Sequence, residues 1–437
     1  MNTCRSGRIL QNADNLIGAI CYFHPRLTLA LPAKKSVYGE RQMHCPASFW
    51  TLTTLAGGRN QSARSMSAKL LVLAIFSLVS LCDVHAQTET ILYRFPANGA
   101  SPQAGLISDG QGNVFGTTSG AFPFLFKIDE SGNFSVLQSI DSIGEISTVI
   151  STLTLDGQGN LYGDLSGSTP LFQTFQFTPT GAYKILSPTG VIFGDPPAGV
   201  VLDAQNNVYG PNCPTGSTVR CSIVKITPAG NVSTLHTFPA GDILLGLSQD
   251  PNGNLYASFS RAGNKNVLTI YKTTVSGQTK LLHKFVGPLL QFASFLTVDA
   301  KGNIYGETLN PFTNNHGSIF ELTPAGTLTT LFTFNGTDGS LAGSCSTFTS
   351  SSQQSLVLDS AGNLYGATSC GGSHGNGTVF KLSPSGALTT LYSFGESSDD
   401  GATPNGVIRD QSGNLLGTTV SGGGSNNNGT VFKITMP

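Results

Sequence analysis

The sequence has few charged residues and little continuous apolar sequence. Asp, Glu, Lys and Arg make up only 11% of its 437 residues, and residues 87–437 hold 14 basic and 21 acidic side chains, a net charge of −7. A mildly acidic chain whose basic residues are scattered is not expected to bind nucleic acid or anionic lipid. The apolar run at residues 70–82 has 13 residues, whereas a membrane-spanning helix needs about 20. We therefore expect no stable membrane insertion of the mature protein.

Motifs for metals and nucleotides are also missing. The sequence contains no Asp-x-Asp-x-Asp-Gly run that would gather several oxygens around calcium. Its stretch SGGGSNNNG is rich in glycine but is not followed by a helical segment whose N-terminus could bind phosphate. Only four cysteines follow residue 86, and they fall in two separated pairs rather than one cluster. We therefore expect neither a cofactor nor a metal.

The segment at residues 66–86 has the pattern of a bacterial export signal. Lys69 provides a short basic start, the apolar run follows, and Val84-His85-Ala86 forms a small-x-small cleavage pattern before Gln87. We therefore expect the protein to be exported, to the periplasm, the cell surface or the medium of a bacterium.

Residues 1–65 precede this signal, although such signals work at the extreme N-terminus. We interpret them as outside the mature protein, either because the start lies at Met66 or because they are disordered. Residues 87–437 then form a single mature domain.

What the sequence does contain is an internal repeat. The strings SDGQGNVFG, LDGQGNLYG, LDAQNNVYG, QDPNGNLYA, VDAKGNIYG, LDSAGNLYG and RDQSGNLLG recur at steps of 47 to 60 residues. Each supplies one carboxylate, so we expect a tight turn in which Asp accepts bonds from the following amides and Gly takes the left-handed conformation. These structural turn residues are Asp109, Asp156, Asp203, Asp250, Asp299, Asp359 and Asp410.

Each repeat is predicted to contain four antiparallel strands. In the sixth repeat these are SLVL, LYGAT, GTVFKL and LTTLYSF, separated by glycine-rich turns. Four strands at this period are typical of a β-propeller blade. The sequence therefore predicts an all-β, seven-bladed β-propeller.

The two ends of the mature chain complement each other. Residues 88–95, TETILYRF, align with a fourth strand such as LTTLYSF, whereas the C-terminal GTVFKITMP is a third strand without a fourth. We expect the N-terminal strand to complete the last blade, because an open ring would leave two strand edges exposed.

Residues 299–437 closely resemble the GloVer tandem repeat of exported bacterial proteins, the choice-of-anchor family. The resemblance is carried by GNLYGATSCGGSHGNGTVFKLSPSGALTTLYSFGESSDDGATPNG and is looser over residues 104–298. It implies export and a repeat fold, but no reaction. The Asp-x-x-Gly-Asn turn is similar, more weakly, to that of NHL-type propellers.

The predicted strand order places short turns on one face and long, variable loops on the other. The long loops are SRAGNKNV, LNPFTNNHGS, SCGGSHGNG and NGTDGSLAGSCSTFTSSSQQS. Function commonly resides on variable loops held by a rigid scaffold, so the long-loop face is the candidate site. All four cysteines that follow residue 86 lie on it, and we expect the disulfides Cys213–Cys221 and Cys345–Cys370.

The candidate ligand-binding residues are polar or aromatic side chains near the long loops of the fifth and sixth repeats: His316, His374, Glu307, Phe312 and Phe348. The alternative for each is a structural role. His236 and His283 occupy strand positions and are expected to be structural. Glu307 could pair with Asp164 as in a glycosidase, but their blades lie nearly opposite, whereas such pairs are about 5–9.5 Å apart.

Two functions fit these features. The leading interpretation is a monomeric extracellular binding or scaffold module whose partner is a polysaccharide or another protein, without catalytic residues. The alternative is a polysaccharide lyase or glycoside hydrolase that uses His316, His374 or Glu307 on the long-loop face. Fold alone does not decide between them.

The first prediction concerns the mature N-terminus. Cleavage before Gln87 removes Trp50, the only tryptophan in the sequence. The secreted protein should therefore show no tryptophan emission, and its intact mass should correspond to residues 87–437. An intact mass that includes residues 1–65 would contradict the interpretation of the export signal.

Overall fold

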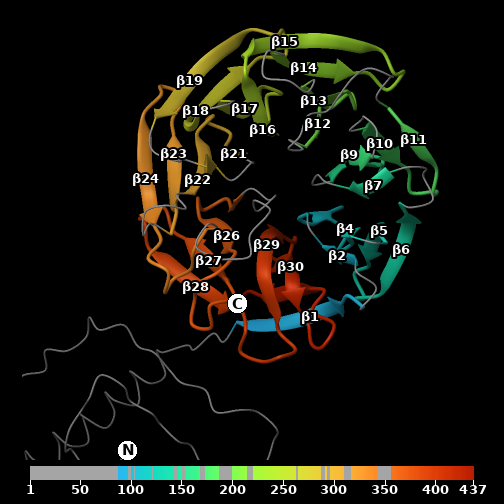
Figure 1. Ribbon diagram of the computed structural model, residues 1–437, viewed down its shortest axis with the longest axis vertical. Coiled ribbons are helices and arrows are strands. Elements are labelled where there is room, and N and C mark those ends of the chain that lie inside the picture. The colour runs from blue at the N-terminus through green and yellow to red at the C-terminus, as the bar shows by residue number, and fades with distance from the viewer. Residues whose placement is uncertain are drawn as a thin grey trace, which may run out of the picture. The chain divides into compact units, whose positions relative to one another are not determined.

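Seven antiparallel β-sheets form a closed ring in the computed structural model (Figure 1). The structure describes residues 87–437 except 97–99, 103, 121, 141–145, 150–152, 168–172, 187–198, 214–219, 262–263, 287–290, 293–295, 310–315 and 342–355. These described residues lie in the compact unit His85–Pro437 and contain no helix. The protein is therefore an all-β, seven-bladed β-propeller, as the repeat predicts.

The blades follow one another along the chain. Blade one contains β2 (Ala100–Pro102), β3 (Ile107–Ser108), β4 (Val114–Gly120), β5 (Phe124–Ile128) and β6 (Phe134–Ser139). Blade two contains β7 (Ile146–Val149), β8 (Thr154–Leu155), β9 (Leu161–Gly167), β10 (Gln173–Phe177) and β11 (Tyr183–Ile185). Blade three contains β12 (Val201–Leu202), β13 (Val208–Asn212), β14 (Arg220–Ile226) and β15 (Val232–Ala240). Blade four contains β16 (Asp242–Gln249), β17 (Leu255–Arg261), β18 (Asn264–Thr273) and β19 (Thr279–Val286).

The last three blades have the same order. Blade five contains β20 (Gln291–Phe292), β21 (Thr297–Val298), β22 (Ile304–Leu309), β23 (Ser318–Leu322) and β24 (Leu328–Thr333). Blade six contains β25 (Val357–Leu358), β26 (Leu364–Thr368), β27 (Thr378–Leu382) and β28 (Leu388–Ser393). Blade seven contains β29 (Gly401–Arg409), β30 (Leu415–Gly422), β31 (Thr430–Thr435) and, from the other end of the described chain, β1 (Thr88–Arg94).

The Asp turns join the first and second strands of each blade. In blade six the Asp359 carboxylate accepts bonds from the backbone amides of Ala361 and Asn363 at 2.9 and 2.8 Å, and from the Tyr365 hydroxyl at 3.0 Å. The glycine of this turn, Gly362, has a φ of 81°, in the left-handed region. In blade three Asn206 takes the same role at a φ of 59°, which asparagine tolerates better than most residues.

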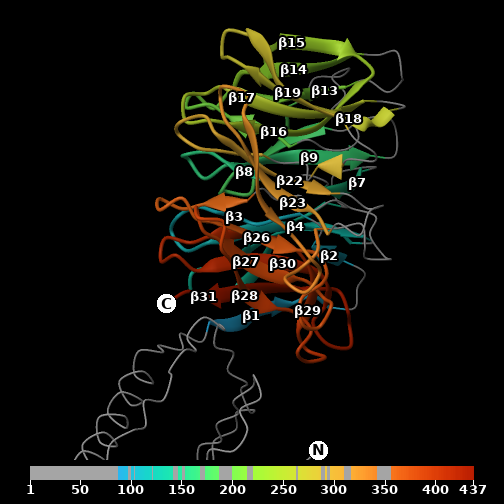
Figure 2. The same cartoon turned by 90° about the vertical axis from the view of Figure 1, so that its left-hand side faces the viewer.

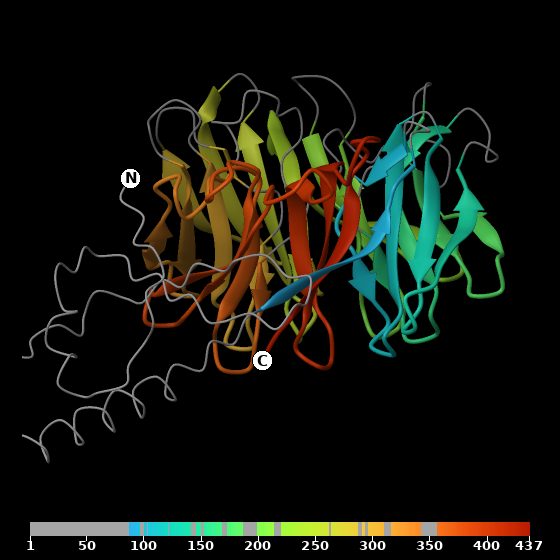
Figure 3. The ribbon, with the colours of Figure 1, turned by 90° about the horizontal axis from the view of Figure 1, so that it is seen from below.

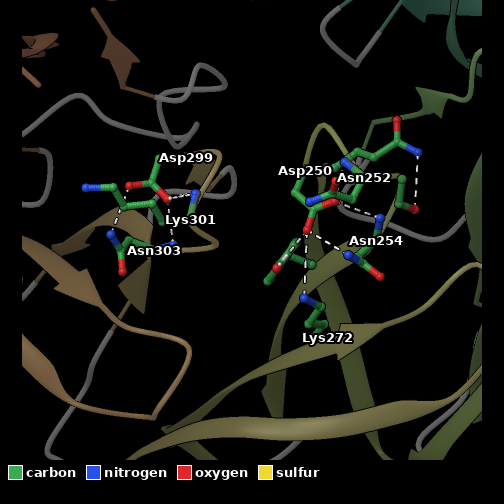
Figure 4. A network of polar contacts seen from close by, with 10 residues as sticks. Asp250, Asn252, Asn254, Lys272, Asp299, Lys301 and Asn303 are labelled. Carbon is green, nitrogen blue, oxygen red and sulfur yellow. Dashed lines mark hydrogen bonds and ion pairs between the residues drawn. The ribbon is translucent and has the colours of Figure 1, made fainter. Parts of the chain in front are cut away.

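A lysine reinforces several of these turns from the third strand. Lys272 on β18 lies 3.8 Å from the Asp250 carboxylate and 5.2 Å from the centre of the Tyr256 ring (Figure 4). Figure 4 also shows the neighbouring turn, in which Asp299 holds the backbone of Lys301 and Asn303. The short-turn face is therefore rigid and largely occupied by its own hydrogen bonds.

The hydrophobic core lies between the blades. Buried residues form seven clusters, one at each junction of adjacent blades. A phenylalanine that follows the outer strand of one blade packs on the third strand of the next: Phe334 lies 5.4 Å from Phe380, and Phe394 lies 5.0 Å from Phe432. Each blade is thus fixed by its neighbour as well as by its own hydrogen bonds.

The Gly of the Tyr-Gly step has a steric reason. At Gly366 in β26 a Cβ atom would stand 2.6 Å from the Phe380 ring, closer than real Cβ atoms approach. The phenylalanine of the third strand therefore lies directly over a glycine of the second strand. This pair explains why the two residues recur together in the repeat.

The N-terminal strand closes the ring. β1 pairs antiparallel with β31 from Thr88 opposite Thr435 to Arg94 opposite Thr430, with a bulge between Ile91 and Tyr93. Figures 2 and 3 show β1, in blue, beside the red strands of blade seven. Beyond the bulge, Tyr93 stacks on Phe134 of blade one at 3.7 Å between ring centres. The predicted closure by complementary ends is confirmed.

One long loop predicted from the sequence is wrong. Most of SRAGNKNV belongs to β17 and β18, which pair from Leu255 opposite Thr273 to Arg261 opposite Asn264. The polar composition suggested a loop, but the ladder continues because buried Leu268 pairs with Ser260 at that level.

The disulfide Cys213–Cys221 is present as predicted and links the ends of β13 and β14, with 4.1 Å between its Cα atoms.

The second prediction concerns closure. Deleting residues 88–95 leaves β31 without a partner and removes Phe95, which is 1% exposed, from the junction of blades seven and one. We expect aggregation or loss of the cooperative melting transition, because an exposed edge strand pairs with other chains. Light scattering and thermal melting measure this. Removal of residues 1–86 alone is the control and should leave the transition intact; a normal transition after deletion of 88–95 would contradict the role of β1.

Candidate functional site

The seam between blades six and seven contains a polar cavity of about 330 Å³. Its walls come from β1, from β28 and from the loop that connects β28 to β29. The lining residues are Glu89, Ile91, Arg94, Tyr392, Ser397, Asp399 and Asp400. We call this cavity the seam pocket; it combines three carboxylates with one guanidinium and one phenol.

Asp400 is the fixed carboxylate of the seam pocket. It is 6% exposed and accepts bonds from the Tyr392 hydroxyl at 3.1 Å, the Gly395 amide at 2.6 Å and the Gly401 amide at 2.7 Å. These donors hold a buried negative charge in place. Burial, followed by the negative charge of Asp400, raises the pKa of Tyr392, so this side chain remains a neutral phenol.

Glu89 is the unusual carboxylate. Burial raises its pKa from 4.5 to about 7, the charge of Asp400 adds to this shift, and Arg94 opposes it. Its Oε1 atom is buried and has no hydrogen-bond donor among the described residues. By contrast, Arg94 and Asp399 are exposed. The seam pocket thus has an inner pair of carboxyl groups and two charged groups that solvent can reach.

The two predicted loop histidines lie in different settings. His316 is half-buried; its Nδ1 atom lies 3.1 Å from the Ser340 hydroxyl, and its carbonyl accepts a bond from the Leu341 amide at 2.8 Å. His374 is exposed, with Nδ1 3.1 Å from the Ser373 hydroxyl. His316 therefore also fixes the connection between blades five and six, whereas His374 is available to a ligand.

Ser373 belongs to a Gly-x-Ser-x-Gly stretch at residues 371–375, which is not among the candidates named from the sequence. In hydrolases this pattern forms a sharp turn from a strand into a helix, but here it lies in the loop between the antiparallel strands β26 and β27. The Ser373 hydroxyl also contacts Ser393 at 2.9 Å, and no carboxylate of the described residues bonds His374. The geometry is that of a glycine-rich loop and not of a catalytic triad.

Glu307 and Asp164 occupy the same position of the repeat on β22 and β9, and both are buried. Glu307 is 5% exposed, and burial raises its pKa to about 8. Asp164 is 1% exposed and accepts a bond from the Thr174 hydroxyl at 2.9 Å. Neither carboxyl group reaches the surface of the long-loop face.

Other predicted site residues fall outside the described part of the chain. These are Phe312, Phe348 and Cys345. Cys370 is a disulfide cysteine, but its predicted partner Cys345 is not described, so this pairing stays a prediction.

Among the described residues, no group of three or more His, Cys, Asp or Glu side chains is placed to hold a metal ion. No helix in the described ranges is long and apolar enough to cross a membrane.

The seam pocket is absent from the candidates named from the sequence, although one signal for it exists. When TETILYRF is aligned with LTTLYSF and LTTLFTF, Glu89 occupies the position of Leu388 and Leu328. A carboxylate in place of leucine is a departure from the repeat. Its partner Asp400 lies more than 300 residues away, so only the closed ring brings them together.

The fold and the repeats define a β-propeller repeat protein. The family model of the Gloeobacter/Verrucomicrobia repeat matches residues 243–437, which confirms the resemblance noted in the sequence. Residues 243–437 therefore carry repeats of this family. A search of curated protein sequences finds no match.

Solved structures share the ring architecture at low sequence identity. Virginiamycin B lyase from Staphylococcus aureus has 15% identity and a TM-score of 0.53, over 80% of this chain and 99% of that chain. A streptogramin B lyase has 12% identity and a TM-score of 0.52, over 80% and 98%. Puromycin hydrolase has 15% identity and a TM-score of 0.52, over 74% of this chain and 50% of its own. At these identities the likeness establishes the fold alone.

The third prediction concerns Glu307. Its pKa of about 8 in the folded state exceeds the ordinary 4.5, so the folded protein holds a proton that the unfolded chain releases between these values. The contribution of Glu307 to stability is then greatest below about pH 4.5 and is lost as the pH rises from 4.5 through 8. Glu307→Gln removes this dependence. The variant should match the wild type near pH 5 and be more stable near pH 9, by about 2–4 kcal/mol.

Denaturant unfolding at several pH values measures this difference. Glu130→Gln, on the exposed Glu130, is the control and should change nothing. Parallel pH profiles for the wild type and Glu307→Gln would show that Glu307 is already ionised in the folded protein.

Proposed function

We propose that the protein is an exported binding module that holds an extracellular polysaccharide at the seam pocket. The observation that carries this proposal is the lining of the pocket: Arg94 and Asp399 at the exposed side, and Tyr392 with Asp400 behind them. Carboxylates and guanidinium groups bond sugar hydroxyls at two points, and a phenol ring offers an apolar face to the sugar. The family repeat and the export-signal pattern at residues 66–86 support an extracellular role.

The scaffold suits binding because the inner residues of the site, Asp400 and Tyr392, are held before a ligand arrives. Asp400 is fixed by backbone amides and by Tyr392, and the loop that carries it is tied to blade seven through the Gly423 amide, which donates to the Asp400 carbonyl at 2.7 Å. Little conformational freedom of these groups is lost on binding, which favours affinity.

A hydrolase or lyase is the second candidate, favoured by one observation. Glu89, whose pKa is about 7, stands beside the charge of Asp400. One protonated and one ionised carboxyl group in a single pocket is the arrangement used in general acid catalysis of glycoside hydrolysis. The solved lyases and hydrolase of the same fold add no argument about the reaction, since they share only the architecture.

The fourth prediction tests binding at the seam pocket. Residues 87–437 on a glycan array should bind a polysaccharide, and Arg94→Ala and Asp399→Ala should each weaken that binding by about 10- to 100-fold, since bonds to charged groups contribute about 1.5–3 kcal/mol. Both side chains are exposed, so at about pH 5, where Glu89 is protonated, the melting temperature should barely change. Glu130→Ala is the matched control.

Two further measurements separate the alternatives. His374→Ala tests the long-loop face of blade six; a loss of binding there, with normal binding by Arg94→Ala and Asp399→Ala, would move the site to that face. A reducing-end assay on any bound glycan separates binding from hydrolysis: release by the wild type and none by Glu89→Gln would establish the enzyme. Absence of glycan binding would contradict the proposal.

A further inference from the structure

The seam pocket is also the place where the ring is held closed. Glu89 lies on β1, the outer strand that completes blade seven, opposite Ile434 of β31. Two residues further along β1, Ile91 lines the same cavity. A change in the protonation of the Glu89 carboxyl group therefore changes the charge on the strand that closes the ring.

The charged groups around Glu89 come from three elements. The loop between β28 and β29 supplies Asp400, whose charge acts on Glu89, together with Asp399 at the pocket wall. β28 supplies Tyr392, which is neutral and bonded to Asp400. β1 itself supplies Arg94, the cation whose charge acts on Glu89.

The remaining charged groups nearby do not neutralise Glu89. Lys433 of β31 pairs with Thr90 in the ladder, but its ammonium group lies 3.3 Å from Asp410, with which it forms an ion pair. Glu396, in the β28–β29 loop, adds another negative charge beside Tyr392. An ionised Glu89 would thus be a partly buried anion close to other anions, with Arg94 as its opposing charge.

We propose that protonation of Glu89 controls how firmly β1 closes the ring: the seam is tight in acid and loosens when the carboxylate ionises. In the protonated state Glu89 adds no charge beside Asp400. In the ionised state its repulsion from Asp400 and the loss of its hydration both act against the seated strand. Opening of β1 hydrates the carboxylate and separates it from Asp400.

The direction of the pH effect follows from linkage. The pKa of Glu89 is about 7 when β1 is seated and near 4.5 when the side chain is free in water. The seated strand therefore holds a proton that the opened strand releases. Closure is strongest below about pH 4.5, weakens through pH 7, and is weakest in alkaline solution. This inference needs no ligand, so it stands or falls independently of polysaccharide binding.

The fifth prediction tests this with hydrogen exchange of residues 87–437, compared with Glu89→Gln at the same pH. At about pH 5 the β1 amides of both proteins should exchange at similar rates. At about pH 8.5 the wild-type β1 should exchange about tenfold faster than that of Glu89→Gln, a value set below the full pKa shift because Glu89 is partly solvated. Strands of the distant blade three, β12 to β15, should show no such difference.

A second variant and a control complete the experiment. Arg94→Gln removes the cation that holds the pKa of Glu89 down when β1 is seated, so the weakening of β1 should continue to higher pH and be larger in alkaline solution than in the wild type. Glu130→Gln, at an exposed site, should follow the wild type. The proposal is overturned if wild type and Glu89→Gln have the same pH profile at β1, or if the acceleration is equal in all blades.

Discussion

The antiparallel pairing of β1 with β31 is the contact on which the other blade contacts depend. Each blade buries its apolar side chains against its two neighbours, because the buried residues cluster at the seven junctions. Such an arrangement is complete only if the last junction forms. β1 contributes to this last junction in two ways. Its backbone completes blade seven, and Phe95, which follows it, packs with its ring centre 5.6 Å from that of Phe126 in blade one. A single strand thereby connects two blades and leaves no open edge between them.

The two faces of the ring follow from the same repeat but differ in chemistry. On the short-turn face, the Asp250 carboxylate is bonded to the backbone of its own turn, to Tyr256 and to Lys272. The polar atoms of such groups already have hydrogen-bond or ion-pair partners, so few of them remain available to a ligand. The β28–β29 loop, on the other face, also has a fixed carboxylate in Asp400, but Asp399 and Arg94 beside it are exposed. We therefore expect ligand binding where exposed polar side chains lie beside a fixed group and are not already bonded within the fold.

The fold was predictable because its determinants recur. The turn around Asp359, the close contact of Gly366 with Phe380 and the Phe334 contact with the next blade each depend on residues at fixed spacing. The seam pocket was not predictable in this way, since Glu89 and Asp400 are joined only by closure of the ring. Burial also changes how a residue should be interpreted: Glu307 stood out as a carboxylate in a strand, but its 5% exposure places it inside the fold. Composition suggested a loop at SRAGNKNV, where strand pairing continues.

Comparison of two junctions shows why the seam differs from an ordinary repeat contact. Between blades five and six, Phe332 occupies the position of Tyr392 and has no hydroxyl to donate. The carboxylate of that loop, Asp338, accepts a hydrogen bond from the backbone amide of Asn335 in the same loop. Between blades six and seven, Tyr392 reaches Asp400, and β1 brings Glu89 to a position that holds leucine in blades five and six. A leucine there would pack without regard to pH. A carboxyl group packs equally well only while it carries a proton, so the strand that closes the ring is also the strand whose attachment responds to acidity.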